Sequence, residues 1–286
     1  MEGVPHGDAT VDIDFNAIAN GDGPAAPQVV EARHAAAYSR HMSRSPEAED
    51  GVVPTAATPD CPHCRKPMPL CVCEDVKPIE SRLGLLILQH PQEQDRALGT
   101  ARLTAMHFEK AVLKVGLSWP SLSKALGRTV ADPSRWAVLY LGSAKAADLG
   151  ATEEVVAINR KGEVAENQRA ILRGIEGVVV LDGTWSQAKA LWWRNAWMLK
   201  CQRLILGPSH PSRYGKLRRE PRRDGLSTIE AAALVLATLE KRPDIAEALN
   251  ASFGRMLGRF REVQNEQPSL APKPRPKRDF RRRRRA

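Results

Sequence analysis

The feature that most constrains the fold is a short apolar run that ends in an acid and leads into a helix start. Residues 178–181 read Val-Val-Val-Leu, which is typical of a buried strand, and Asp182 and Gly183 follow. Thr184 then stands three residues before Gln187. This spacing marks a helix N-terminus, because each side chain accepts a hydrogen bond from a backbone N–H that lacks a partner within the helix. The sequence therefore predicts a strand, a turn and a helix, with Asp182 at the carboxyl end of the strand.

Other strand-sized apolar runs alternate with helical patterns along the chain. The sequence predicts further strands at 83–88, 111–115, 136–141, 155–158 and 203–206. It predicts helices at 96–108, 185–199, 228–240 and from Asp244 to about residue 263. Ser227 and Glu230 repeat the helix-start spacing before the third of these helices. The alternation is typical of an α/β fold.

Ligands of open α/β sheets bind at the carboxyl ends of the strands, so Asp182 is either a site residue or only a turn residue. Two other predicted strands are followed by glycine, at Gly142-Ser143 and at Gly207-Pro208, and glycine lets the backbone approach a ligand closely. The chain has no G-x-G-x-x-G and no G-x-x-x-x-G-K pattern. A Rossmann-type dinucleotide site and a P-loop are therefore not supported.

Four of the five cysteines lie close together, as Cys61, Cys64, Cys71 and Cys73. Their pattern, C-x2-C-x6-C-x-C, supplies the four thiolates of a tetrahedral structural zinc site. A chance cysteine-rich loop is the alternative. Four cysteines complete the coordination of zinc, so we expect a structural metal without an open catalytic position. Cys201 stands alone among apolar residues, and we expect it to be a buried small side chain.

The two ends of the chain carry opposite net charges, and neither has the sequence pattern of a packed structure. Residues 1–58 carry nine acids and three bases, and residues 268–286 carry nine bases and one acid. We expect disordered regions at 1–58 and 266–286, a four-cysteine zinc element at 59–80 and an α/β domain at 81–265. The net charge of +10 indicates a polyanionic partner such as RNA or DNA.

Apolar runs in the chain are too short to span a membrane, and no basic region followed by an apolar block is present at the N-terminus. The sequence therefore predicts a cytoplasmic protein that does not associate with membranes.

Residues 60–250 together resemble the DTW-domain family, which is named for the motif Asp182-x-Thr184-Trp185. The resemblance also rests on the cysteine cluster, on Gln89-His90-Pro91 with Glu93, Arg96 and Leu103, and on Leu226-Ser227-Thr228-x-Glu230-Ala231 after a basic segment ending near Pro221. An isolated motif would be weak, but this order of motifs is specific.

The resemblance implies a fold and an activity. The implied fold is a SPOUT-like α/β sheet with helices on both faces and a C-terminal knot. The implied activity is that of a tRNA-uridine aminocarboxypropyltransferase, which moves the 3-amino-3-carboxypropyl group of S-adenosylmethionine to N3 of a tRNA uridine and leaves methylthioadenosine. Zinc would be structural, and no obligatory protein partner is implied.

The resemblance also implies roles for particular residues. Asp182 would act as the general base that takes the N3 proton, or it would hold the amino group of the cofactor. The helix N-terminus at Ser227 would suit the carboxylate of the cofactor. The expected cofactor contacts are Gly142, Ser143, Asp182, Gly207, Pro208, Leu226, Ser227, Thr228 and Glu230. A capping role alone is the alternative for Glu230.

Basic and aromatic side chains are the expected RNA contacts. The phosphate-binding candidates are Arg96, Lys189, Arg194, Arg213, Arg218, Arg219 and Arg222, and a solvated basic surface is the alternative. At helical spacing Trp185 and Trp192 share one face, and Trp193 and Trp197 share another. These tryptophans are either core residues or, for one of them, a platform on which an RNA base stacks.

Two other functions fit the same sequence. One is a SPOUT-like RNA methyltransferase, because the sulfonium of S-adenosylmethionine carries three electrophilic carbons and the geometry of binding selects among them. The other is a non-catalytic, zinc-containing RNA-binding protein. The sequence does not identify the tRNA, the uridine position or the oligomeric state.

Overall fold

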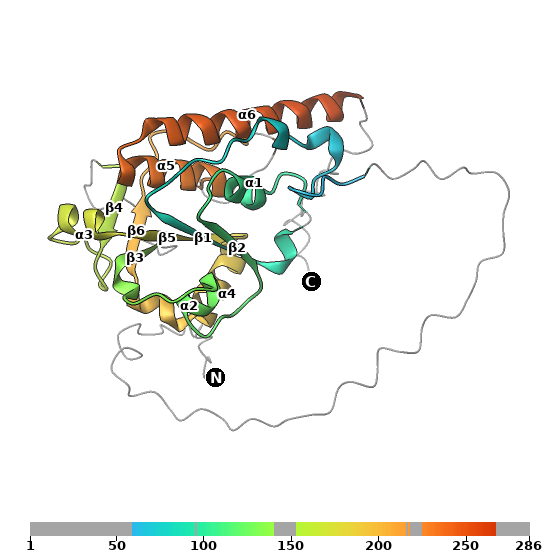
Figure 1. The fold of residues 1–286 in the computed structure, drawn as a ribbon. Helices are drawn as coiled ribbons and strands as arrows, with labels where there is room; N and C mark the ends of the chain where they lie inside the picture. The colour runs from blue at the N-terminus through green and yellow to red at the C-terminus, as the bar shows by residue number, and fades with distance from the viewer. Residues whose placement is uncertain (1–58, 95, 140–152, 216, 218–224, 267–286) are drawn as a thin grey trace, which may run out of the picture. The chain divides into compact units, whose positions relative to one another are not determined.

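A six-stranded sheet forms the centre of the computed structural model (Figure 1). The model describes residues 59–94, 96–139, 153–215, 217 and 225–266. All of these residues belong to one unit, Ala56–Ala286. The predicted disordered regions at 1–58 and 266–286 lie outside the described residues, except for residue 266.

The strands follow the predicted runs closely. They are β1 (Gly84–Gln89), β2 (Ala111–Val115), β3 (Trp136–Leu139), β4 (Val155–Ile158), β5 (Gly177–Asp182) and β6 (Gln202–Leu206). Their order across the sheet is β2-β1-β5-β3-β6-β4, with β4 antiparallel to β6 and the other pairs parallel. The strand that ends at Asp182 therefore lies inside the sheet, between β1 and β3.

Strands β1 and β5 are buried over their whole lengths because helices cover both faces of the sheet. Leu85 and Val178 belong to one apolar cluster, and their chain neighbours Leu86 and Val179 belong to another. The first cluster includes residues of α1 (Ala101–Met106), α5 (Thr228–Glu240) and α6 (Pro243–Glu266), and the second includes residues of α2 (Leu122–Leu126) and α4 (Trp185–Arg194). Figure 1 shows these helices on the two sides of the sheet, which confirms the α/β class with helices on both faces.

Helix α3 (Gln168–Gly174) packs near β4. Of the helices in the described residues, none is both long and apolar enough to cross a membrane.

The prediction of one helix over 185–199 is wrong at its C-terminal end. Helix α4 ends at Arg194, and a separate 3-10 helix covers Ala196–Lys200. The side chain of Asn195 donates to the carbonyl of Leu191 at 2.7 Å and accepts from the backbone of Trp119 at 2.8 Å. A side chain that captures the carbonyl four residues earlier competes with the helix ladder. The predicted pairing of Trp193 and Trp197 on one helix face is therefore also wrong.

The helix predicted at 96–108 is also shorter than expected, because α1 starts at Ala101. The backbone N–H of Gly99 donates to the carbonyl of Arg96 at 2.9 Å, which closes a turn. The ammonium group of Lys66 donates to the carbonyls of Ala97, at 2.6 Å, and Arg96, at 3.4 Å. The carbonyls of Arg96 and Ala97 therefore accept hydrogen bonds from a turn and from a distant lysine, and residues 96–100 form a loop.

Candidate active site and cysteine cluster

Asp182 is buried at the carboxyl edge of the sheet, with 9% of its surface exposed. Its Oδ2 accepts a hydrogen bond from Nε2 of Gln89 at 2.9 Å, and its Oδ1 accepts one from the hydroxyl of Thr228. Its backbone carbonyl accepts from the N–H of His90 at 2.9 Å. A buried carboxylate is costly unless it is hydrogen-bonded, and here both oxygens have donors.

Three segments that are far apart in the sequence meet at this carboxylate. Gln89 ends β1 and lies opposite Asp182 in the parallel pairing of β1 with β5. Thr228 is the first residue of α5, and Ser227 before it forms a capping box with Glu230. The positive end of the α5 dipole therefore lies beside Asp182. The structure brings together three predicted site residues, Asp182, Ser227 and Thr228.

Gly183 allows the turn from β5 into α4. A Cβ atom at this position would lie 2.8 Å from Cβ of Gln187 and 3.5 Å from Cβ of His90. Thr184 caps the helix and forms the predicted capping box with Gln187. The Asp-Gly-Thr-Trp stretch therefore positions the acid by packing a helix start directly against the strand end.

Gln89 belongs to the candidate site by its contact with Asp182, and the sequence patterns assign it no role. Its side chain is 3% exposed, and within the described residues its Oε1 has no hydrogen-bond partner. The amide nitrogen faces Asp182, so the amide oxygen is the acceptor left over. One sequence signal could have identified Gln89. It is a polar residue directly after a predicted apolar strand, and the ends of parallel strands lie at the same edge of a sheet.

Glu230 does more than cap α5. Its carboxylate accepts hydrogen bonds from the backbone and hydroxyl of Ser227, at 2.9 and 2.6 Å, and also from the hydroxyl of Ser212 at 2.6 Å and the N–H of Arg213 at 2.7 Å. The hydroxyl of Tyr214, the residue after Arg213, donates to the carbonyl of Leu98 at 2.6 Å. Glu230 and Tyr214 thus hold residues 212–214, where the basic segment starts, against α5 and the 96–100 loop.

Other predicted cofactor contacts lie farther along the sheet edge or outside the described residues. Gly207 and Pro208 follow β6, which is separated from β5 by β3. The N–H of Gly207 donates to the carbonyl of Glu154 at 2.9 Å, so this N–H already has a partner. Leu226 is half-buried and packs against the apolar cluster that includes α5 and α6. Gly142 and Ser143 lie outside the described residues.

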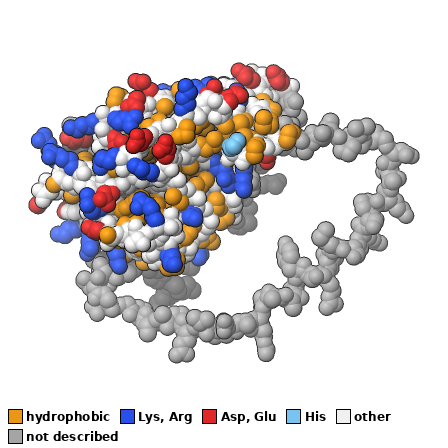
Figure 2. Space-filling model, viewed as in Figure 1, with side chains coloured by type: hydrophobic (Ala, Val, Ile, Leu, Met, Phe, Trp, Pro, Cys, Tyr) orange, Lys and Arg blue, Asp and Glu red, His pale blue; other side chains and the backbone are white. Residues whose placement is uncertain are grey.

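Four of the predicted RNA contacts are exposed: Arg96, Lys189, Arg194 and Arg213. Arg96 lies 3.7 Å from the carboxylate of Glu93, and Arg213 donates to the carbonyl of Asn250 at 3.2 Å. Arg218, Arg219 and Arg222 lie outside the described residues. Figure 2 shows Lys and Arg side chains spread over the visible face with acidic side chains between them, so this face has no single basic patch.

The four clustered cysteines converge as predicted. Their Sγ atoms all lie within 4.8 Å of one another, and those of Cys61 and Cys73 are 3.9 Å apart. Tetrahedral zinc with Zn–S bonds of about 2.3 Å places its sulfurs about 3.8 Å apart. Cys61, Cys64 and Cys71 are buried, and Cys73 is half-buried. The group can hold a metal ion in a closed site.

Lys66 links the cysteine cluster to the 96–100 loop. It lies between Cys64 and Cys71, is 6% exposed, and donates to the two loop carbonyls described above. Burial lowers the pKa of Lys66 to about 8, while the nearby acidic groups Cys64 and Asp182 act in the opposite direction. The cluster therefore supplies a cation that stabilises a loop next to the candidate active site.

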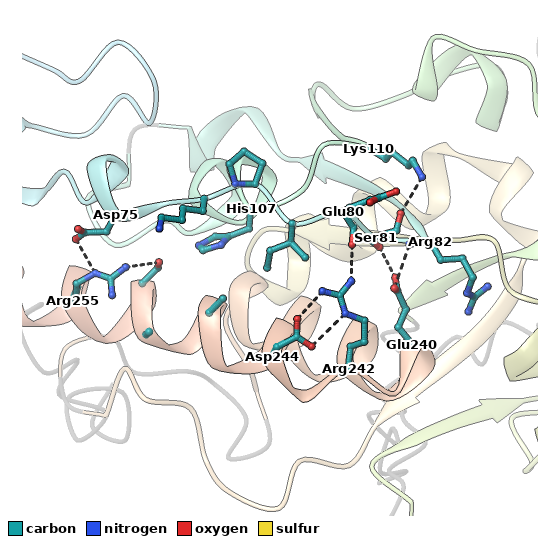
Figure 3. Close-up of a pocket in the computed structure, with 16 residues that line it drawn as sticks. Asp75, Glu80, Ser81, Arg82, His107, Lys110, Glu240, Arg242, Asp244 and Arg255 are labelled. Atoms are coloured by element: carbon teal, nitrogen blue, oxygen red, sulfur yellow. Dashed lines mark hydrogen bonds and ion pairs between the residues drawn. The ribbon is translucent and has the colours of Figure 1, made fainter.

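A cavity of about 860 Å³ lies between residues 75–82 and helix α6 (Figure 3). Neither Gln89 nor Thr228, whose side chains hydrogen-bond Asp182, lines this cavity. Two ion pairs line it: a guanidinium nitrogen of Arg255 lies 3.0 Å from the carboxylate of Asp75, and one of Arg242 lies 2.6 Å from the carboxylate of Asp244. His107 lines it with 2% exposure, and within the described residues neither ring nitrogen has a hydrogen-bond partner. Burial, assisted by the charge of Arg255, lowers the pKa of His107 to about 4.

Comparison with known proteins gives one family and several relatives. The model of the DTW domain matches residues 58–261. The chain is similar to proteins named tRNA-uridine aminocarboxypropyltransferase 2. It is 31% identical to that of Macaca fascicularis over 69% of this chain and 62% of the relative, and 31% identical to that of Mus musculus over 67% and 60%. The relative from Drosophila melanogaster is 30% identical over 66% of this chain and 70% of its own.

The chain thus spans about three fifths of the length of the first two relatives. No solved structure gives a significant match to this chain.

Removal of the metal is expected to destabilise the protein. A strong chelator should lower the melting temperature of the wild type, because a small element built on four thiolates depends on its metal for stability. Cys64→Ser should lower the melting temperature without chelator and remove the response to it. Cys201→Ala is the matched control, since Cys201 lies outside the cluster, and it should keep the chelator response. Metal analysis that finds no zinc in the purified protein would contradict the expectation.

His107 is expected to make folding stability depend on pH. Its pKa in the folded protein, about 4, lies below the ordinary value of 6.5, so between these values the unfolded chain binds more protons. The free energy of unfolding should therefore fall as the pH decreases from about 6.5 to about 4.

Urea unfolding at several pH values measures this effect. His107→Phe should show a smaller decrease in stability over the same range, whereas His210→Phe, at an exposed histidine, should behave like the wild type. An unchanged pH dependence in His107→Phe would show that His107 does not contribute.

Proposed function

Since the chain belongs to the DTW domain family, we propose that it is a tRNA-modifying transferase that moves the 3-amino-3-carboxypropyl group of S-adenosylmethionine to N3 of a tRNA uridine. The proposal rests on one observation: the carboxylate of Asp182 accepts a hydrogen bond from Thr228, the first residue of α5. The names of the relatives support the tRNA and the transferred group.

The residues around Asp182 fit the amino-acid end of S-adenosylmethionine. That end carries an ammonium group and a carboxylate. The carboxylate of Asp182 and the amide oxygen of Gln89 are acceptors for an ammonium group, and the N-terminus of α5 at Ser227 and Thr228 suits a carboxylate. Leu226, Gly207, Pro208, Gly142 and Ser143 are proposed to complete the contacts, whereas Glu230 positions Ser227.

When bound, the co-substrate supplies an electrophilic carbon next to its sulfonium. Uridine N3 carries a proton and becomes a good nucleophile only when that proton is lost. Asp182 is the proposed acceptor for this proton, because its carboxylate is held at the sheet edge by Gln89 and Thr228. Alternatively, Asp182 holds the ammonium group of S-adenosylmethionine. In that role it would orient the co-substrate so that the carbon of the aminocarboxypropyl group faces N3 of the uridine.

The other parts of the chain have supporting roles in this proposal. The four cysteines are proposed to hold a structural zinc ion, which stabilises the element that contains Lys66. Exposed bases such as Arg96, Lys189, Arg194 and Arg213, together with Arg218, Arg219 and Arg222, are proposed to bind tRNA phosphates. A SPOUT-like arrangement with a C-terminal knot and a cytoplasmic location stay predictions.

Isotopic labelling separates this function from its two alternatives. The protein is incubated with unmodified tRNA and S-adenosylmethionine labelled either in the methyl carbon or in the carboxyl carbon. The proposal predicts that only carboxyl label enters tRNA and that methylthioadenosine is released. Transfer of methyl label alone would identify a methyltransferase, and tRNA binding without any transfer would identify a non-catalytic RNA-binding protein.

Replacement of the central acid is expected to abolish turnover without unfolding the protein. Asp182→Asn should lower the transfer rate by at least about 100-fold, which is the usual range for loss of a general base. The melting temperature and the Kd for tRNA should stay close to those of the wild type.

Two variants make this test specific. Gln89→Leu should reduce the transfer rate less than Asp182→Asn, because it removes one hydrogen bond to the carboxylate and leaves the acid in place. Asp132→Asn, at an exposed helix cap where asparagine serves equally well, should have no effect. Near-normal transfer by Asp182→Asn would refute the role of Asp182.

A further inference from the structure

Helix α4 carries aromatic and basic side chains on its solvent side. Trp193 is 52% exposed, which makes it one of the large apolar side chains on the surface of the described residues. The ammonium group of Lys189 lies 5.9 Å from the ring centroid of Trp185. On the inner side, Ala188 and Leu191 are buried in the apolar cluster under the sheet. The exposed tryptophan is therefore not needed to fill the core.

The spacing along the helix places these side chains in one row. Trp185, Lys189 and Trp193 are four residues apart, so they lie on the same side of α4. At 1.5 Å per residue, Trp185 and Trp193 are about 12 Å apart along the axis. The helix starts at Trp185, three residues after Asp182, so the row begins beside the candidate active site and leads away from it.

The charge of this surface selects one class of partner. Helix α4 contains Lys189 and Arg194, both exposed, and no acidic residue. The guanidinium group of Arg203 lies 5.6 Å from the ring centroid of Trp192, which adds a third base next to the helix. Aromatic rings with interleaved bases are suited to single-stranded nucleic acid, because rings stack on bases and cations bind phosphates.

We propose that the row formed by Trp185, Lys189 and Trp193 binds an unpaired segment of tRNA next to the modified uridine, with Trp193 stacked on a base. The inference rests on the proposed function, because it takes tRNA as the substrate. An unpaired segment fits better than a duplex, since the bases of an A-form helix are stacked on each other and cannot stack on a side chain. The row would hold a uridine near Asp182 by holding its neighbours.

The test compares tRNA binding by variants of the full chain, without S-adenosylmethionine. Trp193→Ala should raise the Kd for unmodified tRNA about tenfold, an effect typical of losing one stacked base. Trp193→Phe should restore most of the affinity, because a phenyl ring also stacks. Leu199→Ala is the matched control, since Leu199 is an exposed apolar residue at 44% exposure outside the row, and it should bind like the wild type.

The salt dependence and the fluorescence separate stacking from a general loss of structure. Trp193→Ala should keep the wild-type slope of log Kd against log salt, whereas Lys189→Ala should reduce it, because only a phosphate contact releases counterions. Trp193→Phe should lose part of the tryptophan quenching caused by tRNA while it still binds. The inference is overturned if Trp193→Ala binds tRNA like the wild type or if Trp193→Phe binds as weakly as Trp193→Ala.

The failure of this inference and the failure of the proposed function give different results. If the wild type transfers carboxyl label and Trp193→Ala binds tRNA normally, the stacking surface is wrong and the function stands. If the wild type binds tRNA but transfers no label, the proposed function is wrong, and the affinity of Trp193→Ala still decides the stacking surface. In the transfer assay, loss of stacking should raise KM for tRNA and leave kcat close to the wild-type value.

Discussion

The candidate active site depends on the buried carboxylate of Asp182, which accepts hydrogen bonds from two other parts of the chain. Asp182 would be costly inside the sheet edge if it were alone, and the amide of Gln89 and the hydroxyl of Thr228 offset this cost. The same two hydrogen bonds fix the end of β1 and the start of α5 to the end of β5. These hydrogen bonds hold the carboxylate of Asp182, the amide of Gln89 and the N-terminus of α5 at fixed positions relative to one another.

The loop at 96–100 is the second point on which the site depends. It receives Lys66 from the cysteine cluster, the hydroxyl of Tyr214 from the basic segment, and, at Thr100, the N–H of Ile229 from α5. A metal in the cysteine cluster would therefore act on the site through Lys66 and without contact with a substrate. This connection gives a physical reason why a cysteine cluster that can hold a metal precedes a domain whose proposed chemistry requires no metal.

Much of the fold was predictable because it is encoded locally. The apolar runs predicted the strands, and the spacings Thr184-Gln187 and Ser227-Glu230 predicted two helix starts that form as capping boxes. The predictions that were wrong involve distant partners. Helix α4 ends early because Asn195 binds Leu191, Leu117 and Trp119. Residues 96–100 do not join α1 because Lys66 binds the carbonyls of Arg96 and Ala97. Gln89 was missed because its role exists only opposite Asp182.

The sequence by itself determined which residue types are available: an acid at a strand end, four thiols at metal spacing, and a basic chain with tryptophans along one helix. These follow from local backbone preferences and from composition, which need no knowledge of the fold. Only the tertiary structure decided that Gln89 and Thr228 hold the acid, that Lys66 reaches the 96–100 loop, and that Trp193 is exposed while Trp197 is buried. The reason is physical, since hydrogen bonding and burial depend on which distant segments the packing of the sheet brings together.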